Sequence, residues 1–176
     1  MQRVMIVGGP GSGKSTLARM LGEITNLPVY HMDHIHWKSG WVERAADEKH
    51  PLIAEIQARD QWIFEGNHSR SYNERIVRAD TFIWLDMGFA LRFWRIIRRT
   101  LFGLGRNRPD LPDGCPEHIG RESLMFWRWA WDTRHSHRDK LLAIMDAPPA
   151  HVTVHHLTSL RAVQAYLCSL EHERTQ

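Results

Sequence analysis

Short apolar runs alternate with amphipathic stretches along most of this chain. The runs predict five strands, at 4–7, 28–32, 61–65, 81–85 and 151–157, the first of them a buried parallel strand. Between them, apolar residues at helical spacing predict helices at 14–25, 48–59, 89–102, 121–145 and 158–170. Because strands and helices alternate, we expect one domain over residues 1–176, with a parallel sheet covered by helices on both faces.

Proline, threonine and glycine refine this outline. Pro51 fits a helix only in its first turn, and Thr158 is expected to cap the last helix. Residues 103–120 hold three prolines and four glycines, which predicts a long loop. Loops of this length in a compact domain are usually functional, so this segment is a candidate lid.

The segment between the first strand and the first helix, GGPGSGKS, fits the pattern GxxxxGK[ST] in full. Glycines let such a loop wrap a phosphate with its N–H groups inward, and the helix N-terminus adds partial positive charge. Lys14 can reach the β- and γ-phosphates, and the Ser15 hydroxyl can hold magnesium. The pattern predicts an NTP-binding site made by Gly8, Gly9, Pro10, Gly11, Ser12, Gly13, Lys14, Ser15 and Thr16.

Charge is uneven along the chain, although the net charge is only +3. Six arginines and no acid lie between Arg92 and Arg108. This excess favours an anionic partner, either nucleotide phosphate or nucleic acid, and a solvated arginine face is the alternative.

The rest of the composition excludes several classes of protein. Hydrophobic residues at 43% and charged residues at 24% are globular values, which argues against a disordered chain. Cys115 and Cys168 form no CxxC pair, so neither a disulfide framework nor a zinc finger is expected. Because the first strand begins near Arg3, no signal peptide is expected. Because the sequence has no apolar run of 18 residues, no membrane span is expected. The expected location is the cytoplasm.

Four stretches of the sequence resemble a known group of proteins. GGPGSGKST is similar to the phosphate loop of adenylate kinase. VYHMDHIHW, WIFEGNHSR and GRNRPDLPDGCPE resemble a related bacterial group whose members are often labelled DNA topology modulation proteins. The resemblance implies an α/β fold, that of a nucleoside-monophosphate-kinase-like P-loop NTPase. Its five-stranded parallel sheet would have the order 2-3-1-4-5, with a mobile lid at about 103–120.

In small-molecule kinases of that fold, a carboxylate at the position of Asp33 binds the acceptor hydroxyl or takes its proton. The acceptor must lie in line with the γ-phosphate and lose a proton as it attacks. A turn cap is the structural alternative for Asp33. His31, His34 and His36 surround it. Alternation along an extended segment would place His31 on the opposite face from the other two, which argues against a three-ligand metal site.

Glu65, which ends the third strand, matches the position where the family usually has the aspartate that holds a magnesium-bound water. Glutamate is longer by one methylene, about 1.5 Å. Asp86 follows the fourth strand and has the usual residue type. Topology leaves both open, and the resemblance favours Glu65. Arg70 lies one residue later than the arginine with which adenylate kinase grips acceptor phosphate, and we expect it to contact the acceptor.

Arginines around the lid complete the expected site. Arg95 and Arg99 match the paired arginines that adenylate kinase uses against adenine and phosphate, and with Arg92 they form one helical stripe. Guanidinium groups suit a transferring phosphoryl group because they match phosphate oxygens and keep their charge. Contact with solvent or nearby acids is the alternative. The further members of this set are Arg106 in the lid and Arg134 and Arg138 after it.

Trp127, Trp129 and Trp131 are spaced two residues apart, which spreads them around a helix. We expect at least one to face the core and one the acceptor cleft, with core packing favoured over base stacking.

These features predict an ATP-dependent phosphotransferase that requires Mg²⁺ and moves the γ-phosphoryl group to a small acceptor, a nucleotide, nucleoside or other metabolite. Its expected catalytic residues are Lys14, Asp33 and Arg99. Two other functions stay open: an ATP-switched regulator that binds DNA through the arginine helix, and a plain ATPase. The chain has no helix-turn-helix signature, and its basic excess is compact enough to serve one nucleotide.

Overall fold

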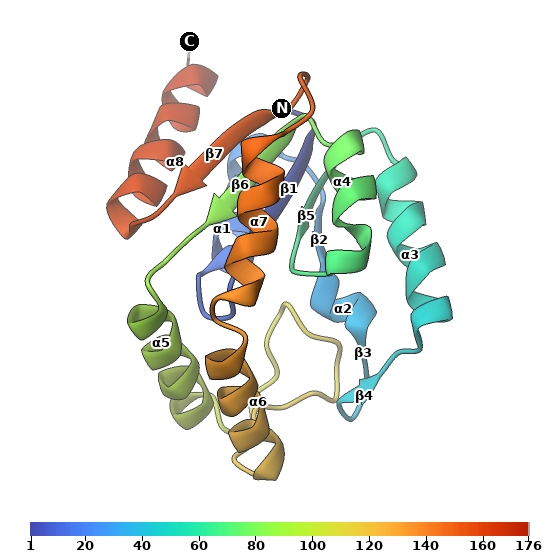
Figure 1. Cartoon of the computed structure of the whole chain (residues 1–176), viewed down its shortest axis with the longest axis vertical. Helices are drawn as coiled ribbons and strands as arrows, with labels where there is room; N and C mark the ends of the chain where they lie inside the picture. Colours follow the sequence, from blue (N-terminus) through green and yellow to red (C-terminus); the bar gives the residue numbers. More distant parts are fainter. Residues whose placement is uncertain (176) are drawn as a thin grey trace.

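The computed structural model of the protein describes residues 1–175. Five parallel strands form one sheet in the order β2-β5-β1-β6-β7 (Figure 1). Counted along the chain, this is the order 2-3-1-4-5, so the predicted topology is confirmed. The strands are β1 (Arg3–Gly8), β2 (Val29–His31), β5 (Trp62–Glu65), β6 (Thr81–Leu85) and β7 (Thr153–Leu157).

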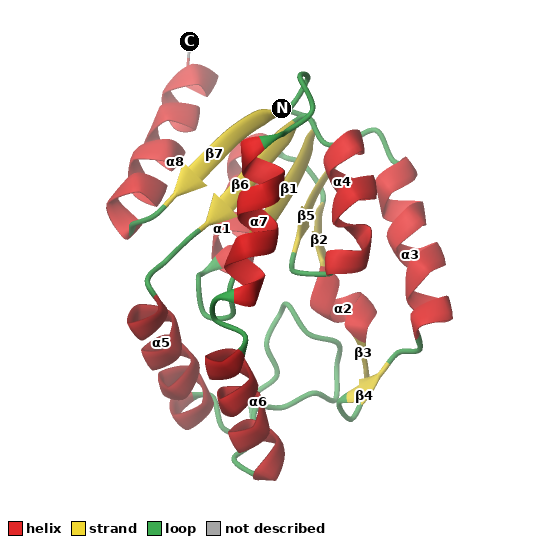
Figure 2. Cartoon of the chain, in the orientation of Figure 1, coloured by secondary structure: helices red, strands yellow, loops and turns green. Residues whose placement is uncertain are grey.

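Helices cover both faces of this sheet (Figure 2). One face carries α1 (Lys14–Thr25) and α8 (Leu160–Thr175). The other carries α3 (Ala46–Ala58), α4 (Tyr72–Arg78), which follows the 3₁₀ turn η1 (Ser69–Ser71), and α7 (Ser136–Asp146). Beyond the carboxyl ends of the strands lie the 103–120 loop, α2 (Met32–His36), α5 (Phe89–Phe102), α6 (Arg121–Asp132) and the hairpin of β3 (Trp37–Lys38) and β4 (Val42–Glu43).

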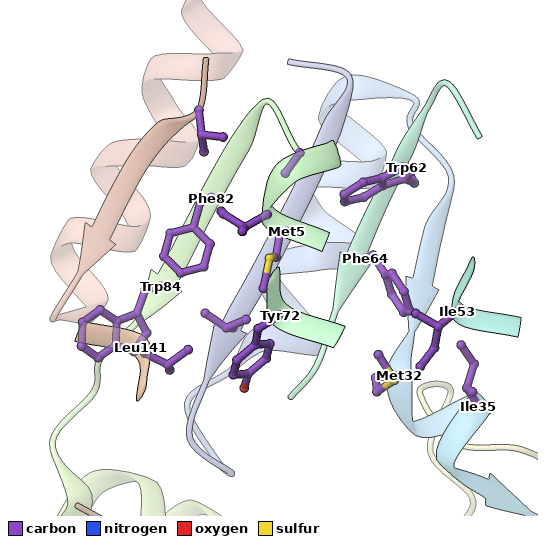
Figure 3. Packing of buried hydrophobic residues seen from close by; sticks show 14 residues of the cluster. Met5, Met32, Ile35, Ile53, Trp62, Phe64, Tyr72, Phe82, Trp84 and Leu141 are labelled. Atoms are coloured by element: carbon purple, nitrogen blue, oxygen red, sulfur yellow. The ribbon is translucent and has the colours of Figure 1, made fainter. Parts of the chain in front are cut away.

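Successive residues of each inner strand pack on opposite faces of the sheet. Met5 and Val7 of β1 belong to the core beneath α3, α4 and α7 (Figure 3), whereas Val4 and Ile6 pack with α1 and α8. All four are fully buried. The inner strands β1, β5 and β6 are therefore buried on both sides, which is why they appear in the sequence as continuous apolar runs.

The single helix predicted at 121–145 is wrong, because the structure has two helices there. The Thr133 N–H and hydroxyl both donate to the carbonyl of Trp129, at 3.0 and 2.7 Å, and α6 ends at this point. Leu141 of α7 then packs in the sheet core, whereas Trp131 of α6 packs on Phe89 of α5. The break lets one segment contact two different layers.

Two helix starts also differ from the predictions. α3 begins at Ala46, so Pro51 lies in its second turn and not in its first. At the start of α8, the hydroxyl of Ser159, and not of Thr158, accepts the Ala162 N–H at 3.1 Å. The apolar pattern predicts neither the short helices α2 and α4 nor the β3–β4 hairpin. Among the described residues, no helix is both long and apolar enough to cross a membrane.

Candidate functional site

The P-loop joins β1 to α1 at the carboxyl edge of the sheet. Gly11 and Gly13 have φ angles of 75° and 98°, which glycine adopts without strain. The loop can therefore turn sharply into α1, whose N-terminus follows Gly13. Lys14 folds back over the loop, and its Nζ donates to the Gly9 carbonyl at 3.4 Å.

Ser15, in the first turn of α1, is flanked by two carboxylates. Its hydroxyl lies 3.0 Å from Glu65 Oε1 and 3.3 Å from Asp110 Oδ2. Glu65 also contacts His31 Nδ1 at 2.7 Å. Hydroxyl and carboxylate oxygens are the ligands that Mg²⁺ prefers, so Ser15 and Glu65 fit a magnesium ion that is bound together with phosphate oxygens.

Asp86, the other metal candidate, pairs with side chains of α7 and β7. Its carboxylate is 3.1 Å from Arg138 Nη2 and 3.1 Å from His156 Nε2. Of the two acids, Glu65 is the one that reaches the P-loop hydroxyl.

The buried side chain of Arg75, on α4, holds the end of β5. Its Nη2 donates to the Phe64 carbonyl and its Nη1 to the Gly66 carbonyl, both at 2.8 Å, so it grips the backbone on either side of Glu65. The guanidinium also lies 4.4 Å from the centre of the Phe64 ring. Burial lowers the pKa of Arg75 to about 10, so the group stays charged at neutral pH.

Asp33 lies in the first turn of α2, two residues after β2, and lines the same cavity as Lys14. Burial raises the pKa of its carboxyl, as does the charge of Glu65, while Lys14 and Arg108 act in the opposite direction. In the described part of the chain, no side chain donates a hydrogen bond to this carboxylate. It is therefore available to an incoming hydroxyl group.

The three histidines around Asp33 have separate partners. Residues 32–36 are helical, so the assumption of an extended segment is wrong. Among the side chains that the structure describes, no group of three His, Cys, Asp or Glu is arranged to hold a metal ion. His31 contacts Glu65, His34 Nε2 lies 3.0 Å from the Pro109 carbonyl, and the His36 ring packs on Trp37.

The arginine stripe of α5 faces the P-loop. Arg92 and Arg95 donate to P-loop carbonyls at 3.4–3.5 Å, and Arg99 Nε lies 3.0 Å from Glu117 Oε1. Arg95 and Arg99 line the cavity. The other four predicted arginines do not line it. Arg70 and Arg106 are exposed, Arg134 lies over the Trp131 ring, and Arg138 pairs with Asp86.

Three lid residues that sequence reasoning missed form a charged cluster over the P-loop. Arg108 Nη1 lies 2.8 Å from Asp110 Oδ2, and Arg108 Nε lies 2.9 Å from Glu117 Oε1. The same Glu117 oxygen contacts Arg99, and Asp110 reaches Ser15. Only the position of Arg108 in the arginine-rich segment could have indicated this cluster.

One cavity of about 1060 Å³ joins these groups. The P-loop, Asp33 and the α5 arginines form part of its wall. The rest of the wall includes four tryptophans, Trp37, Trp41, Trp127 and Trp129, together with polar residues such as Glu122 and Ser123. Trp131, in contrast, packs on the α5 rings of Phe89 and Phe93.

No protein-family model matches the chain, and no curated protein matches it. Solved structures do match. Shikimate kinase from Bacteroides thetaiotaomicron aligns with a TM-score of 0.56 and 14% identity over 99% of each chain. Shikimate kinase from Acinetobacter baumannii, in complex with shikimate, aligns with a TM-score of 0.54 and 16% identity over 99% of this chain and 94% of that one. A sugar kinase from Janibacter sp. HTCC2649 aligns with a TM-score of 0.50 and 15% identity over 99% of this chain and 92% of that one. The chain therefore has the α/β fold of small P-loop kinases.

Proposed function

We propose that this protein is an ATP-dependent kinase that transfers the γ-phosphoryl group to a hydroxyl group of a small molecule. The observation that carries the proposal is that a complete P-loop and the Asp33 carboxylate, which accepts no hydrogen bond from a described side chain, line one cavity. The fold, shared with shikimate kinases and a sugar kinase, supports it.

In this reaction the acceptor oxygen forms a bond to the γ-phosphorus, and the bond from that phosphorus to the β–γ bridging oxygen breaks. ADP leaves with the electron pair, and the hydroxyl proton passes to Asp33. A raised pKa suits Asp33 to this task, because a more basic carboxylate takes the proton more readily. Lys14 binds the β- and γ-phosphates, and Ser15 and Glu65 would hold Mg²⁺, which neutralises phosphate charge.

Arg99 and Arg108 would stabilise the transferring group. Both contact one oxygen of Glu117, yet neither Nε–H is aligned on it as a hydrogen bond. A phosphoryl group can offer these donors well-aligned oxygens, and such charge-assisted contacts are strong in a site that excludes water.

The P-loop assignment is tested with Lys14→Ala. Loss of a hydrogen bond to a charged group costs about 1.5–3 kcal/mol, so ATP affinity should fall by about tenfold to a hundredfold. Titration calorimetry measures this change, and Lys140→Ala, at an exposed position on α7, is the matched control. Unchanged ATP affinity in Lys14→Ala would remove the proposal.

A further inference from the structure

The cavity wall that continues from Asp33 is built of aromatic rings. Trp37 follows α2 directly, and its ring meets the Trp41 ring edge to face, with centroids 5.5 Å apart. The Trp41 ring in turn lies 6.3 Å from that of His118 in the lid. Trp127 and Trp129 of α6 line the same cavity.

Trp41 is held in an unfavourable backbone conformation. Its φ is 60°, in the left-handed region that bulky residues avoid. The Trp41 indole N–H donates to the Pro116 carbonyl of the 103–120 loop at 3.0 Å, which orients the ring. Trp41 closes the three-residue turn between β3 and β4, so the hairpin sets this φ, and the turn presents the indole ring to the cavity.

The free positive charges of the cavity lie near the P-loop and not near the tryptophans. In the described part of the chain, the lining cations that lack a carboxylate partner are Lys14, Arg19 and Arg95, on α1 or on α5 beside the P-loop. Arg99 and Arg108 contact Glu117 and, in the proposed reaction, serve the transferring phosphoryl group.

Near the tryptophan pair, the cations are paired as well. Lys38 lies 2.7 Å from Glu48, and Lys49 lies 2.6 Å from Glu43. Among the described residues, the aromatic wall therefore has no free cation for a second anionic group of the acceptor, and the Asp33 carboxylate would repel such a group.

We propose that the acceptor is an uncharged heteroaromatic alcohol of the nucleoside class, an inference that rests on the proposed function. Its ring packs on Trp37 and Trp41, and its hydroxyl lies at Asp33. This hydroxyl oxygen bonds to the γ-phosphorus, ADP leaves with the bridging oxygen, and Asp33 takes the proton. An acceptor that already carries a phosphate or carboxylate is excluded by charge.

The test compares each common nucleoside with its own 5′-monophosphate, and with shikimate and gluconate, as acceptors. ADP production is measured with saturating ATP and Mg²⁺, and phosphorylated products are identified by mass. We expect one or more nucleosides to be phosphorylated, with the matching monophosphate at least about tenfold lower in kcat/KM, a difference of about 1.4 kcal/mol. Preference for a monophosphate or an acid would overturn the acceptor class and leave the kinase intact.

A ring deletion tests the tryptophan wall separately. Trp37→Leu should raise the acceptor KM about tenfold, within the range for loss of one base–aromatic stack, and should leave the KM for ATP unchanged. Trp37→Phe should restore most of the acceptor affinity, which separates stacking from loss of folding. Trp94→Leu, at an exposed ring on α5 outside the cavity, is the control.

Each remaining outcome is decisive. An acceptor KM that is unchanged in Trp37→Leu would overturn the stacking. ATP binding by calorimetry without phosphorylation of any nucleoside would overturn the acceptor class. Absence of ATP binding to the wild-type chain would instead overturn the proposed function itself.

Discussion

The carboxylate of Asp33 is in an environment that opposes its charge. An aspartate ordinarily titrates well below neutral pH. Burial and the charge of Glu65 raise the pKa of Asp33, and Lys14 and Arg108 limit the rise. The fold therefore favours the neutral form of this group, whereas the proposed reaction requires the charged form. Stability and activity should respond in opposite directions to a change at this position.

Asp33→Asn is expected to raise the melting temperature and to lower the rate. The amide keeps the shape of the side chain and removes a charge that the fold disfavours. Without a positioned proton acceptor, transfer should slow by about 10²–10⁴-fold, while ATP affinity remains. Calorimetric melting, ATP titration and ADP production measure the three quantities. A parallel loss of ATP affinity would assign Asp33 to the metal or to the structure of the site.

The pH dependence gives a second readout of the same residue. As the pH falls through the raised pKa of Asp33, the carboxylate is protonated and can no longer accept a proton, so the rate falls on the acid side. Because Arg108 lowers this pKa, Arg108→Gln should move the acid limb to higher pH. Arg98→Gln, on an exposed position of α5, is the control. An acid limb that stays in place in Arg108→Gln would contradict the role of Asp33.

At the scale of elements, burial decided what could be predicted from the sequence. Strands β1 and β6 are buried on both faces, so their apolar runs alone identify them. The break after Thr133 could not be found in this way, because it depends on α6 and α7 packing against different layers. The β3–β4 hairpin has two residues per strand, too few for a periodic pattern.

Arg75 of α4 holds the end of β5, which carries Glu65 of the site. Removing this side chain leaves the carbonyls of Phe64 and Gly66 without their donors in a buried position. Each such loss costs about 1–3 kcal/mol, so Arg75→Met should lower the free energy of unfolding by several kcal/mol. It should also raise the Mg²⁺ concentration needed for activity, because the end of β5 carries Glu65.

The control for this prediction is on the same helix. Arg78 is exposed and its Nε donates to the Gln57 carbonyl, so Arg78→Met should change stability much less and leave the Mg²⁺ requirement alone. Denaturant unfolding and magnesium titration of activity measure the two effects. If Arg75→Met destabilises the protein but keeps the wild-type Mg²⁺ dependence, Arg75 has no positioning role for Glu65.

At the scale of the whole molecule, parallel topology brings the site together. Lys14, Asp33 and Glu65 each follow or end a strand, so the order of the strands alone predicts that they meet at one edge. The ion pairs of Arg108 and Asp110 depend on the path of the 103–120 loop, for which the sequence has no local signal. They could therefore not be predicted.

The 103–120 loop joins the two halves of the site. Asp110 reaches Ser15 of the P-loop at 3.3 Å. A few residues later, the loop meets the β3–β4 hairpin, where the Gly114 carbonyl accepts the Gly40 N–H at 2.9 Å. Because Asp110 contacts the hydroxyl that would hold Mg²⁺, binding of nucleotide with Mg²⁺ should change this contact. The lid should therefore rearrange on ATP and close fully only when the acceptor is also bound.

Arg99, which connects α5 to the lid through Glu117, allows kinase and DNA binder to be distinguished. In a kinase, Arg99→Ala should lower the transfer rate more than ATP affinity, because its phosphate contact tightens in the transition state. Adenosine joined by phosphates to a nucleoside should then protect residues 103–120 from proteolysis better than ATP does. Arg98 is a neighbouring exposed residue of α5, and Arg98→Ala should retain the wild-type rate.

A DNA binder would give another result. The salt slope of its duplex binding would be lower by about one unit in Arg99→Ala, and its ATP turnover would be unchanged. Protection of the lid by duplex DNA but by no small molecule would contradict the kinase proposal.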